Sequence, residues 1–212
     1  MAVDPSRFQL DLEIDVSRAT RAQIAIASKA RVRPFKRDGL SIVGGADVAY
    51  SESVAVAAYA ELDLEKNKLL SLTKPILAPL VDYQPGFLAF REAGSVLDLI
   101  RGLKASPQLM LVNGHGLAHP RLCGLATHLG VVLQLPTVGL ARSTLGSPAN
   151  TYNRLFSQKV GNLYVSPGNL ISLQDSVDIV NSLPVRYGYP EPLGSAHHES
   201  KRALTAELRE KG

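Results

Sequence analysis

The sequence has little of the chemistry that builds disulfide-rich, zinc-cluster or membrane-spanning proteins. Cys123 is the only cysteine among 212 residues, which excludes an intramolecular disulfide and a zinc site made from several cysteines. No apolar run reaches the roughly 18 residues of a transmembrane helix. The first residues also lack the basic and then apolar layout of a secretory signal. We therefore expect a cytoplasmic protein with no membrane partner.

The remaining composition is that of an ordinary globular protein. Hydrophobic residues make up 45% of the chain and charged residues 20%, which is enough apolar material for a core. The length corresponds to about one domain, and there is no internal repeat or low-complexity linker. We expect a single domain over residues 1–212 and a monomer.

Positive charge is concentrated near the N-terminus. The chain holds 23 lysines and arginines against 19 acidic residues, a net charge of +4, which permits a polyanionic partner without demanding one. A helix is expected in this region, ending at Pro34. Its basic side chains form either a solvated face or a phosphate-contacting face. Residues 16–37 include no acid and seven basic residues: Arg18, Arg21, Lys29, Arg31, Arg33, Lys36 and Arg37.

The hydrophobic periodicity predicts strands first and an alternation of helices and strands afterwards. Three consecutive antiparallel strands are expected at 41–50, 54–64 and 68–76. Further strands are expected at 108–112, 137–140, 162–166 and 170–173, and helices at 86–104, 120–129, 174–183 and 195–211. This order predicts an α/β fold with a mixed sheet and helices on its faces.

Two acidic residues stand where apolar side chains would be expected. Asp47 lies on a strand that is apolar on both faces, and Glu92 lies on the same helical stripe as Leu88 and Val96. A buried carboxylate is costly unless it is paired, hydrogen-bonded or bound to a metal. Each acid also has a purely structural explanation. Asp47 could cap a turn before Ser51, and Glu92 could form a salt bridge with a lysine or arginine.

Residues 113–120, NGHGLAHP, follow an apolar strand. Gly114 and Gly116 allow a close approach of backbone to a ligand, and His115 and His119 offer donors or metal ligands at the strand end. A glycine-rich turn with one capping and one exposed histidine would also fit. The pair His197 and His198 is a weaker signal, because paired histidines near a C-terminus are often only solvent-exposed.

The sequence resembles endonuclease V in five ordered segments that span essentially the whole chain. They are GGADVAY at 44–50, YQPGFLAFREAG at 83–94, NGHGLAHPRLCGLATHLGV at 113–131, PTVGLARSTL at 136–145 and PEPLGSAH at 190–197. The resemblance implies a ribonuclease H-like fold. It also implies a Mg²⁺-dependent endonuclease, with Mn²⁺ as an alternative ion, that cuts DNA or RNA at the second phosphodiester 3′ of deoxyinosine or inosine.

The resemblance also implies roles for individual residues. Asp47 and Glu92 match metal-binding acids, and His197 matches a histidine near the metal that orients or deprotonates water or contacts phosphate. Arg142 stands where the family usually has lysine, which suits phosphate contact but not proton transfer. Residues matching the wedge and the pocket for the flipped base are Tyr83, Gln84, Pro85, Gly86, Leu88, Gly114, Gly116, His119 and Leu145; Gln84 replaces a residue that is often apolar.

Asn113 departs from the family pattern, which has aspartate as a third metal-site acid. Asparagine keeps a neutral carbonyl ligand but removes one negative charge, which should weaken metal binding and water activation. Three explanations stay open: an enzyme that tolerates asparagine, an alteration made to trap a substrate complex, and a protein that binds without cutting. We expect an inosine-specific nuclease of reduced competence in DNA repair or inosine-RNA processing. The alternatives are a non-cleaving reader of inosine-containing nucleic acid and an unrelated phosphate-ester hydrolase.

Overall fold

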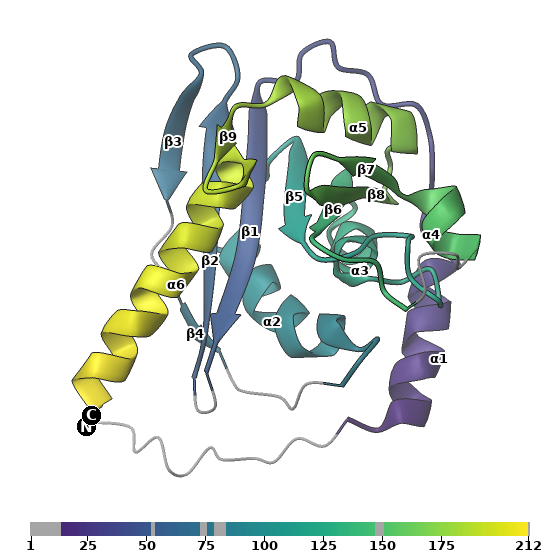
Figure 1. The fold of residues 1–212 in the computed structure, drawn as a ribbon, viewed down its shortest axis with the longest axis horizontal. Coiled ribbons are helices and arrows are strands. Elements are labelled where there is room, and N and C mark those ends of the chain that lie inside the picture. The colour runs from purple at the N-terminus through teal and green to yellow at the C-terminus, as the bar shows by residue number, and fades with distance from the viewer. Residues whose placement is uncertain (1–13, 52–53, 73–75, 79–83, 147–150, 212) are drawn as a thin grey trace.

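An eight-stranded mixed sheet forms the centre of the molecule (Figure 1). The computed structural model describes residues 14–51, 54–72, 76–78, 84–146 and 151–211. The strand order is β3-β2-β1-β5-β6-β8-β7, and β4 pairs with β2. The strands are β1 (Ile42–Tyr50), β2 (Ala55–Asp63), β3 (Lys68–Leu72), β4 (Ile76–Ala78), β5 (Leu109–Asn113), β6 (Thr137–Ala141), β7 (Gln158–Val160) and β8 (Leu163–Asn169), with a separate hairpin of β9 (Val185–Arg186) and β10 (Tyr189–Pro190).

The directions of the strands confirm the ribonuclease H-like arrangement. Strands β1, β2 and β3 are antiparallel neighbours, whereas β5 and β6 run parallel to β1. Strand β8 returns antiparallel to β6. Strand β1 pairs antiparallel with β2 on one side and parallel with β5 on the other, so it is an interior strand of the sheet.

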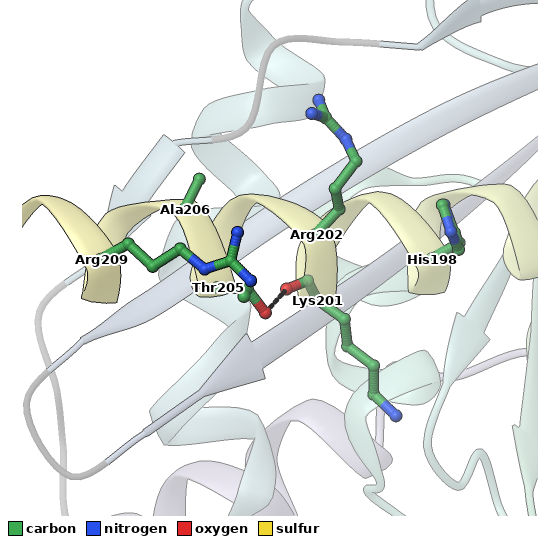
Figure 2. A pocket seen from close by; sticks show the side chains of 6 residues that line it. All are labelled: His198, Lys201, Arg202, Thr205, Ala206 and Arg209. Carbon is green, nitrogen blue, oxygen red and sulfur yellow. Dashed lines mark hydrogen bonds between the residues drawn. The ribbon is translucent and has the colours of Figure 1, made fainter.

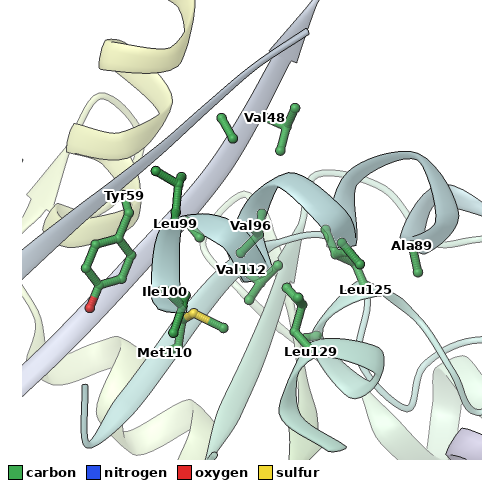
Figure 3. Close-up of a cluster of buried hydrophobic side chains, with 14 of the residues drawn as sticks. Val48, Tyr59, Ala89, Val96, Leu99, Ile100, Met110, Val112, Leu125 and Leu129 are labelled. Carbon is green, nitrogen blue, oxygen red and sulfur yellow. The ribbon is translucent and has the colours of Figure 1, made fainter. Parts of the chain in front are cut away.

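Helices cover both faces of this sheet (Figure 1). On one face, α2 and α3 pack against the sheet in an apolar cluster, in which side chains such as Val96 and Leu129 lie around Met110 and Val112 (Figure 3). On the other face, α5 and the start of α6 enclose a second cluster that includes Leu111 and Leu193. The helices are α1 (Val16–Ala27), α2 (Leu88–Arg101), α3 (Leu125–Leu133), α4 (Thr151–Phe156), α5 (Leu173–Ser182) and α6 (Glu191–Lys211).

Strand β1 is buried on both faces, as its apolar sequence predicts. Alternate side chains point to opposite faces. Ala46 and Val48 join the cluster under α2 and α3, whereas Val43 joins the cluster on the face of α5 and α6. Asp47 shares the face of Val43, so the strand directs a carboxylate toward α6.

The helix expected to begin at Pro120 begins instead at Leu125, so that prediction was wrong. Residues 117–124 form successive turns, with Leu122 in the left-handed region at a φ of 52°. Gly124 packs so closely on the backbone of His115 that a Cβ atom would not fit there. The 113–124 segment is therefore folded back onto itself before α3 starts.

Several other boundaries differ from the sequence prediction. The expected strand 170–173 is absent from this described segment, because Leu170 adopts a left-handed φ of 55° and Ser172 caps α5. Helix α6 begins four residues earlier than expected, and α1 ends well before Pro34. The short elements α4, β4, β7, β9 and β10 were not predicted. Among the described residues, no helix combines the length and apolarity that crossing a membrane would take.

Gly45 allows α6 to lie against β1, and replacing it tests that packing. A Cβ atom at Gly45 would overlap the backbone of Pro192 and Leu193. Gly45→Ala should therefore lower the free energy of unfolding by about 1–3 kcal/mol, or roughly 2–12 °C in melting temperature. Gly94→Ala is the matched control, because Gly94 is exposed in α2 with no atom near the added methyl group. The control should be neutral or stabilising, and equal melting of both variants would contradict the close packing.

Candidate active site

Asp47 is held by side chains from three separate parts of the chain. Asn113 Nδ2 donates to Asp47 Oδ1 at 2.7 Å, and Ser200 Oγ donates to Asp47 Oδ2 at 2.6 Å. His197 Nδ1 lies 3.1 Å from the same Oδ2. Burial alone would raise the pKa of Asp47, but the hydrogen bonds from His197, Ser200 and Asn113 outweigh it and lower the pKa. Asp47 is therefore a buried and ionised carboxylate.

The secondary structure explains why these partners meet. In the parallel pairing of β1 and β5, Ala46 lies opposite Val112, so the next residues, Asp47 and Asn113, stand side by side. His197 and Ser200 are three residues apart on α6 and thus share one helix face. The sheet supplies one side of the arrangement and the helix supplies the other.

Glu92 approaches Asp47 from α2. Burial and the negative charge of Asp47 raise the pKa of Glu92 well above its usual value, against a smaller opposing effect of Arg91. Among the described residues, no side chain donates a hydrogen bond to the Glu92 carboxyl. The Glu92 carboxyl is therefore harder to ionise than an ordinary glutamate, first because it is buried and second because the Asp47 charge repels its own.

This donor set fits a hard divalent cation. Such ions prefer carboxylate and amide oxygens, and a cation would remove the repulsion between Asp47 and Glu92. Since Asn113 uses its nitrogen for Asp47, its side-chain oxygen remains available as a neutral ligand. In the described part of the chain, no group of three or more histidine, cysteine or acidic side chains is placed to hold a metal. The site therefore contains two acids and an amide.

Arg142 and Tyr189 lie beside His197. The Arg142 Nε atom donates to the Tyr189 hydroxyl at 2.9 Å, and its guanidinium lies 4.7 Å from the centre of the same ring. The Tyr189 ring is 5.1 Å from the His197 ring, centre to centre. Buried Tyr189 therefore holds an exposed positive charge next to the candidate acid–base histidine.

A pocket of about 340 Å³ opens next to these residues. Glu92, Asn113, Arg142 and Tyr189 contribute to its wall on one side. Five of the residues implied by the resemblance for base binding also line it: Gly86, Leu88, Gly114, His119 and Leu145. The structure thus brings these five residues to one cavity with Glu92 and Asn113, whereas Asp47 lies behind Asn113 and is not among the lining residues.

Three other predicted residues lie differently. Gly116 packs against β8, where its N–H donates to Ser166 Oγ at 2.8 Å and a Cβ atom would overlap Pro167. It supports the loop and is not part of the pocket wall. Gln84 is half-buried and Pro85 exposed at the approach to α2, and neither lines the pocket. Tyr83 lies outside the described residues.

The Gly86 carbonyl oxygen organises the pocket floor. It accepts hydrogen bonds from Gln23 Nε2 at 2.9 Å and Arg121 Nη2 at 2.7 Å, and His119 Nε2 lies 3.1 Å away. The Arg121 backbone N–H donates to His119 Nδ1. His119 Nδ1 is therefore the acceptor, and Nε2 carries the hydrogen that points to Gly86.

Sequence reasoning missed Gln23, Arg121, Tyr189 and Ser200. Ser200 could have been found from its spacing to His197 on a helix. Gln23 gave no such signal, because it reaches Gly86 from 63 residues away in the chain. The seven basic residues of the 16–37 segment are all exposed, which fits both interpretations of that segment.

Comparison with known proteins identifies the family. The family model for endonuclease V matches residues 24–159 and 151–198. The chain belongs to the endonuclease V family. It is 36% identical to endonuclease V of Thermus thermophilus, over 89% of this chain and 93% of that protein. It is 39% identical to endonuclease V of Pyrococcus horikoshii, over 75% and 72% respectively.

Solved endonuclease V structures share the fold. The catalytic domain of human endonuclease V is 27% identical, with a TM-score of 0.80 over 91% of this chain and 97% of that one. Endonuclease V of Ciona intestinalis, in complex with a DNA that contains an inosine followed by a ribo-adenosine, is 25% identical with a TM-score of 0.81, over 92% and 99%. Membership of the endonuclease V family places this chain among the nucleases, which are hydrolases.

The acid sensitivity of His119 gives a test of the pocket floor. Burial, with the charge of Arg121, lowers the pKa of His119 from 6.5 to about 4. Between pH 6.5 and about pH 4 the unfolded chain binds a proton at this histidine and the folded chain does not. The contribution of neutral His119 to the free energy of unfolding is therefore fully present above pH 6.5 and is lost as the pH falls toward 4. His119→Gln keeps a donor for Gly86 but does not titrate.

Denaturant unfolding at pH 7 and pH 5 measures this effect. The unchanged chain should lose about 1–2 kcal/mol more free energy of unfolding over that interval than His119→Gln, since one proton corresponds to about 1.4 kcal/mol per pH unit. Buried His115 and His128 have lowered pKa values too, through burial, but both proteins contain them. If the free energy of unfolding falls equally in both proteins between pH 7 and pH 5, His119 is not held neutral in the folded chain.

Proposed function

We propose that this member of the endonuclease V family is a metal-dependent enzyme that cleaves DNA or RNA at the second phosphodiester 3′ of deoxyinosine or inosine. Its role would be DNA repair or inosine-RNA processing. The observation that carries the proposal is the buried, ionised Asp47, which accepts a hydrogen bond from Asn113. Asn113 and Glu92 line a pocket together with His119 and Leu145. The inosine-containing DNA bound by the Ciona relative supports the choice of substrate.

Asp47, Glu92 and the Asn113 side-chain oxygen would hold Mg²⁺ or Mn²⁺. When bound, such an ion neutralises charge on the phosphate and lowers the pKa of water. The chain's own contribution is to keep Asp47 ionised before the ion arrives, through donors from His197 and Ser200. Hydrogen bonds from protein groups thus preorganise one ligand.

His197 is suited to handle the proton of the attacking water. Hydrolysis forms a bond from the water oxygen to phosphorus, breaks the bond from phosphorus to a sugar oxygen, and delivers a proton to that leaving oxygen. Since ionised Asp47 accepts from His197 Nδ1, that nitrogen carries a hydrogen and Nε2 is left to accept one or to contact phosphate. Arg142, oriented by Tyr189, supplies a permanent positive charge for a phosphate oxygen.

The pocket is suited to a planar base extruded from the strand. Gly86 and Gly114 let backbone approach the base, while Leu88 and Leu145 supply apolar walls. Neutral His119 braces Gly86 and adds a polar edge. Tyr83, Gln84 and Pro85 would form the wedge that fills the space left by the base.

Asn113 supports a second candidate function, a reader that binds inosine-containing nucleic acid without cutting it. The amide contributes no charge to the site, and its nitrogen is occupied by Asp47. Cleavage of labelled oligonucleotides separates the two functions. The enzyme cuts an inosine strand when Mg²⁺ or Mn²⁺ is added and not with chelator, whereas a reader only binds it.

Removing either carboxylate should abolish metal-dependent cleavage. Asp47→Ala or Glu92→Ala takes away one of the two charged ligands, so we expect a loss of at least about 100-fold in single-turnover rate. Circular dichroism should show that both variants fold. Lys104→Ala, an exposed change after α2, is the control that should cleave normally. Unchanged cleavage by both variants in saturating metal would rule out this metal site.

Asn113→Asp should change metal affinity and metal-free stability in opposite directions. A third carboxylate next to Asp47 attracts a divalent ion, so the Kd for Mg²⁺ should fall about tenfold or more and single-turnover cleavage should rise. Without metal, the Asn113 hydrogen bond becomes a repulsion and the melting temperature should drop. Asn113→Leu removes both the hydrogen bond and the ligand oxygen without adding charge, so it should lower stability and metal affinity together. Equal or lower cleavage by Asn113→Asp would mean that the site is built around asparagine.

A further inference from the structure

The tip of the β9–β10 hairpin has an unusual residue. Strand pairing of Arg186 with Tyr189 leaves a two-residue loop, Tyr187 and Gly188, with φ values of 53° and 78°. Such loops strongly favour asparagine, aspartate or glycine at the first position, because a bulky side chain with positive φ costs free energy. An aromatic residue kept in this conformation suggests a use beyond the turn itself.

Tyr187 is half of an exposed aromatic stack. Its ring lies parallel to the His198 ring, with centres 4.4 Å apart and 10° between the planes. The guanidinium of Arg186 lies 5.3 Å from the centre of the Tyr187 ring. Tyr187 is 48% exposed, and Val185 beside it is 74% exposed. Arg186 is itself paired with Glu191 at 3.0 Å, so the exposed flat rings are the feature here on which unpaired bases stack.

The stack adjoins the candidate active site. His197 faces Asp47, whereas the next residue, His198, faces outward and meets Tyr187. On the other side of the loop, Tyr189 contacts both His197 and Arg142. A strand that leaves the site past His197 therefore reaches the Tyr187–His198 stack directly.

A basic groove continues from His198 along α6. It has a volume of about 420 Å³ and is lined by His198, Lys201, Arg202, Thr205, Ala206 and Arg209 (Figure 2). All six are exposed, and every ionisable residue among them is basic. From His198 to Arg209 the helix rises roughly 16 Å. Arg202 is paired with Glu199, whereas no acidic partner of Lys201 or Arg209 is found in the described part of the chain.

We propose that the Tyr187–His198 stack and this groove bind the single-stranded part of the substrate outside the inosine pocket. A base stacks on the rings, and the phosphates that follow lie along Lys201 and Arg209. A nucleic-acid strand fits because it alone needs both a flat apolar contact and a row of positive charge. This assignment rests on the proposed function for the location of the strand, but it makes a separate prediction about strand length.

Binding of labelled single strands to Tyr187→Asn and Tyr187→Phe tests the stack. Asparagine suits the positive φ and removes the ring, and phenylalanine keeps the ring. Anisotropy is measured in chelator, so that no strand is cut, on inosine strands with one, four or eight flanking nucleotides on either side. We expect Tyr187→Asn to lose about 5- to 100-fold in affinity for the long strands and little for the short ones. Tyr187→Phe should bind like the unchanged chain.

A salt series tests the groove. Lys201→Ala and Arg209→Ala should each reduce the slope of log affinity against log salt by about 0.7 per lost phosphate contact. Lys104→Ala removes the same charge from the exposed segment between α2 and β5, outside the groove, and should leave the slope unchanged. The slope should change only with strands long enough to reach the groove.

The same assay on matched strands with guanosine in place of inosine separates this proposal from the proposed function. Equal affinity of the unchanged chain for inosine and guanosine strands would overturn inosine recognition, while a length-dependent loss in Tyr187→Asn would still support the stack. A loss independent of strand length, or none at all, would overturn the stack. If Lys201→Ala and Arg209→Ala both leave the salt slope unchanged, the groove does not bind the strand. This face of α6 would then be a solvated surface or a contact for an acidic protein.

Discussion

The buried carboxylate of Asp47 is the constraint on which the site depends. A charge inside a sheet is tolerable only with several donors around it, and here they come from β5 and α6. The same hydrogen bonds that hold Asp47 ionised bring His197 to its working position. The site therefore depends on the packing of α6 against β1 across Gly45, which places His197 and Ser200 at Asp47.

Charge balance explains the remaining chemistry of the cluster. Burial and the retained charge of Asp47 together raise the pKa of Glu92, so this carboxyl takes up a proton more readily than usual. A divalent ion reverses this and permits both groups to be ionised. Asn113 lowers the electrostatic repulsion in the metal-free protein by donating to Asp47, at the expense of attraction for the ion. Under the proposed function, this one residue would set the balance between stability without metal and affinity for the metal.

The pocket depends on backbone that is held from several directions. The Gly86 carbonyl receives donors from α1 and from the loop before α3, which makes the floor rigid. Arg142, which also lines the pocket, donates a hydrogen bond to Tyr189 of the β9–β10 hairpin. The hairpin thus belongs to the site on one side and carries the exposed Tyr187 on the other. The β9–β10 hairpin could therefore contribute both to the site and to binding of the nucleic-acid strand outside it.

The sequence by itself determined the mixed α/β fold, the central strand around Asp47 and the buried helical stripe with Glu92, because local hydrophobic periodicity predicts each of them. It also determined the family, through five motifs in a fixed order. It did not determine where α3 begins, since the left-handed Leu122 and the tight packing of Gly124 depend on contacts with the preceding loop. Only the tertiary structure revealed Gln23 and Tyr189 at the site. Hydrogen bonds between residues far apart in the chain leave no periodic trace, and they form only when the sheet and α6 come together.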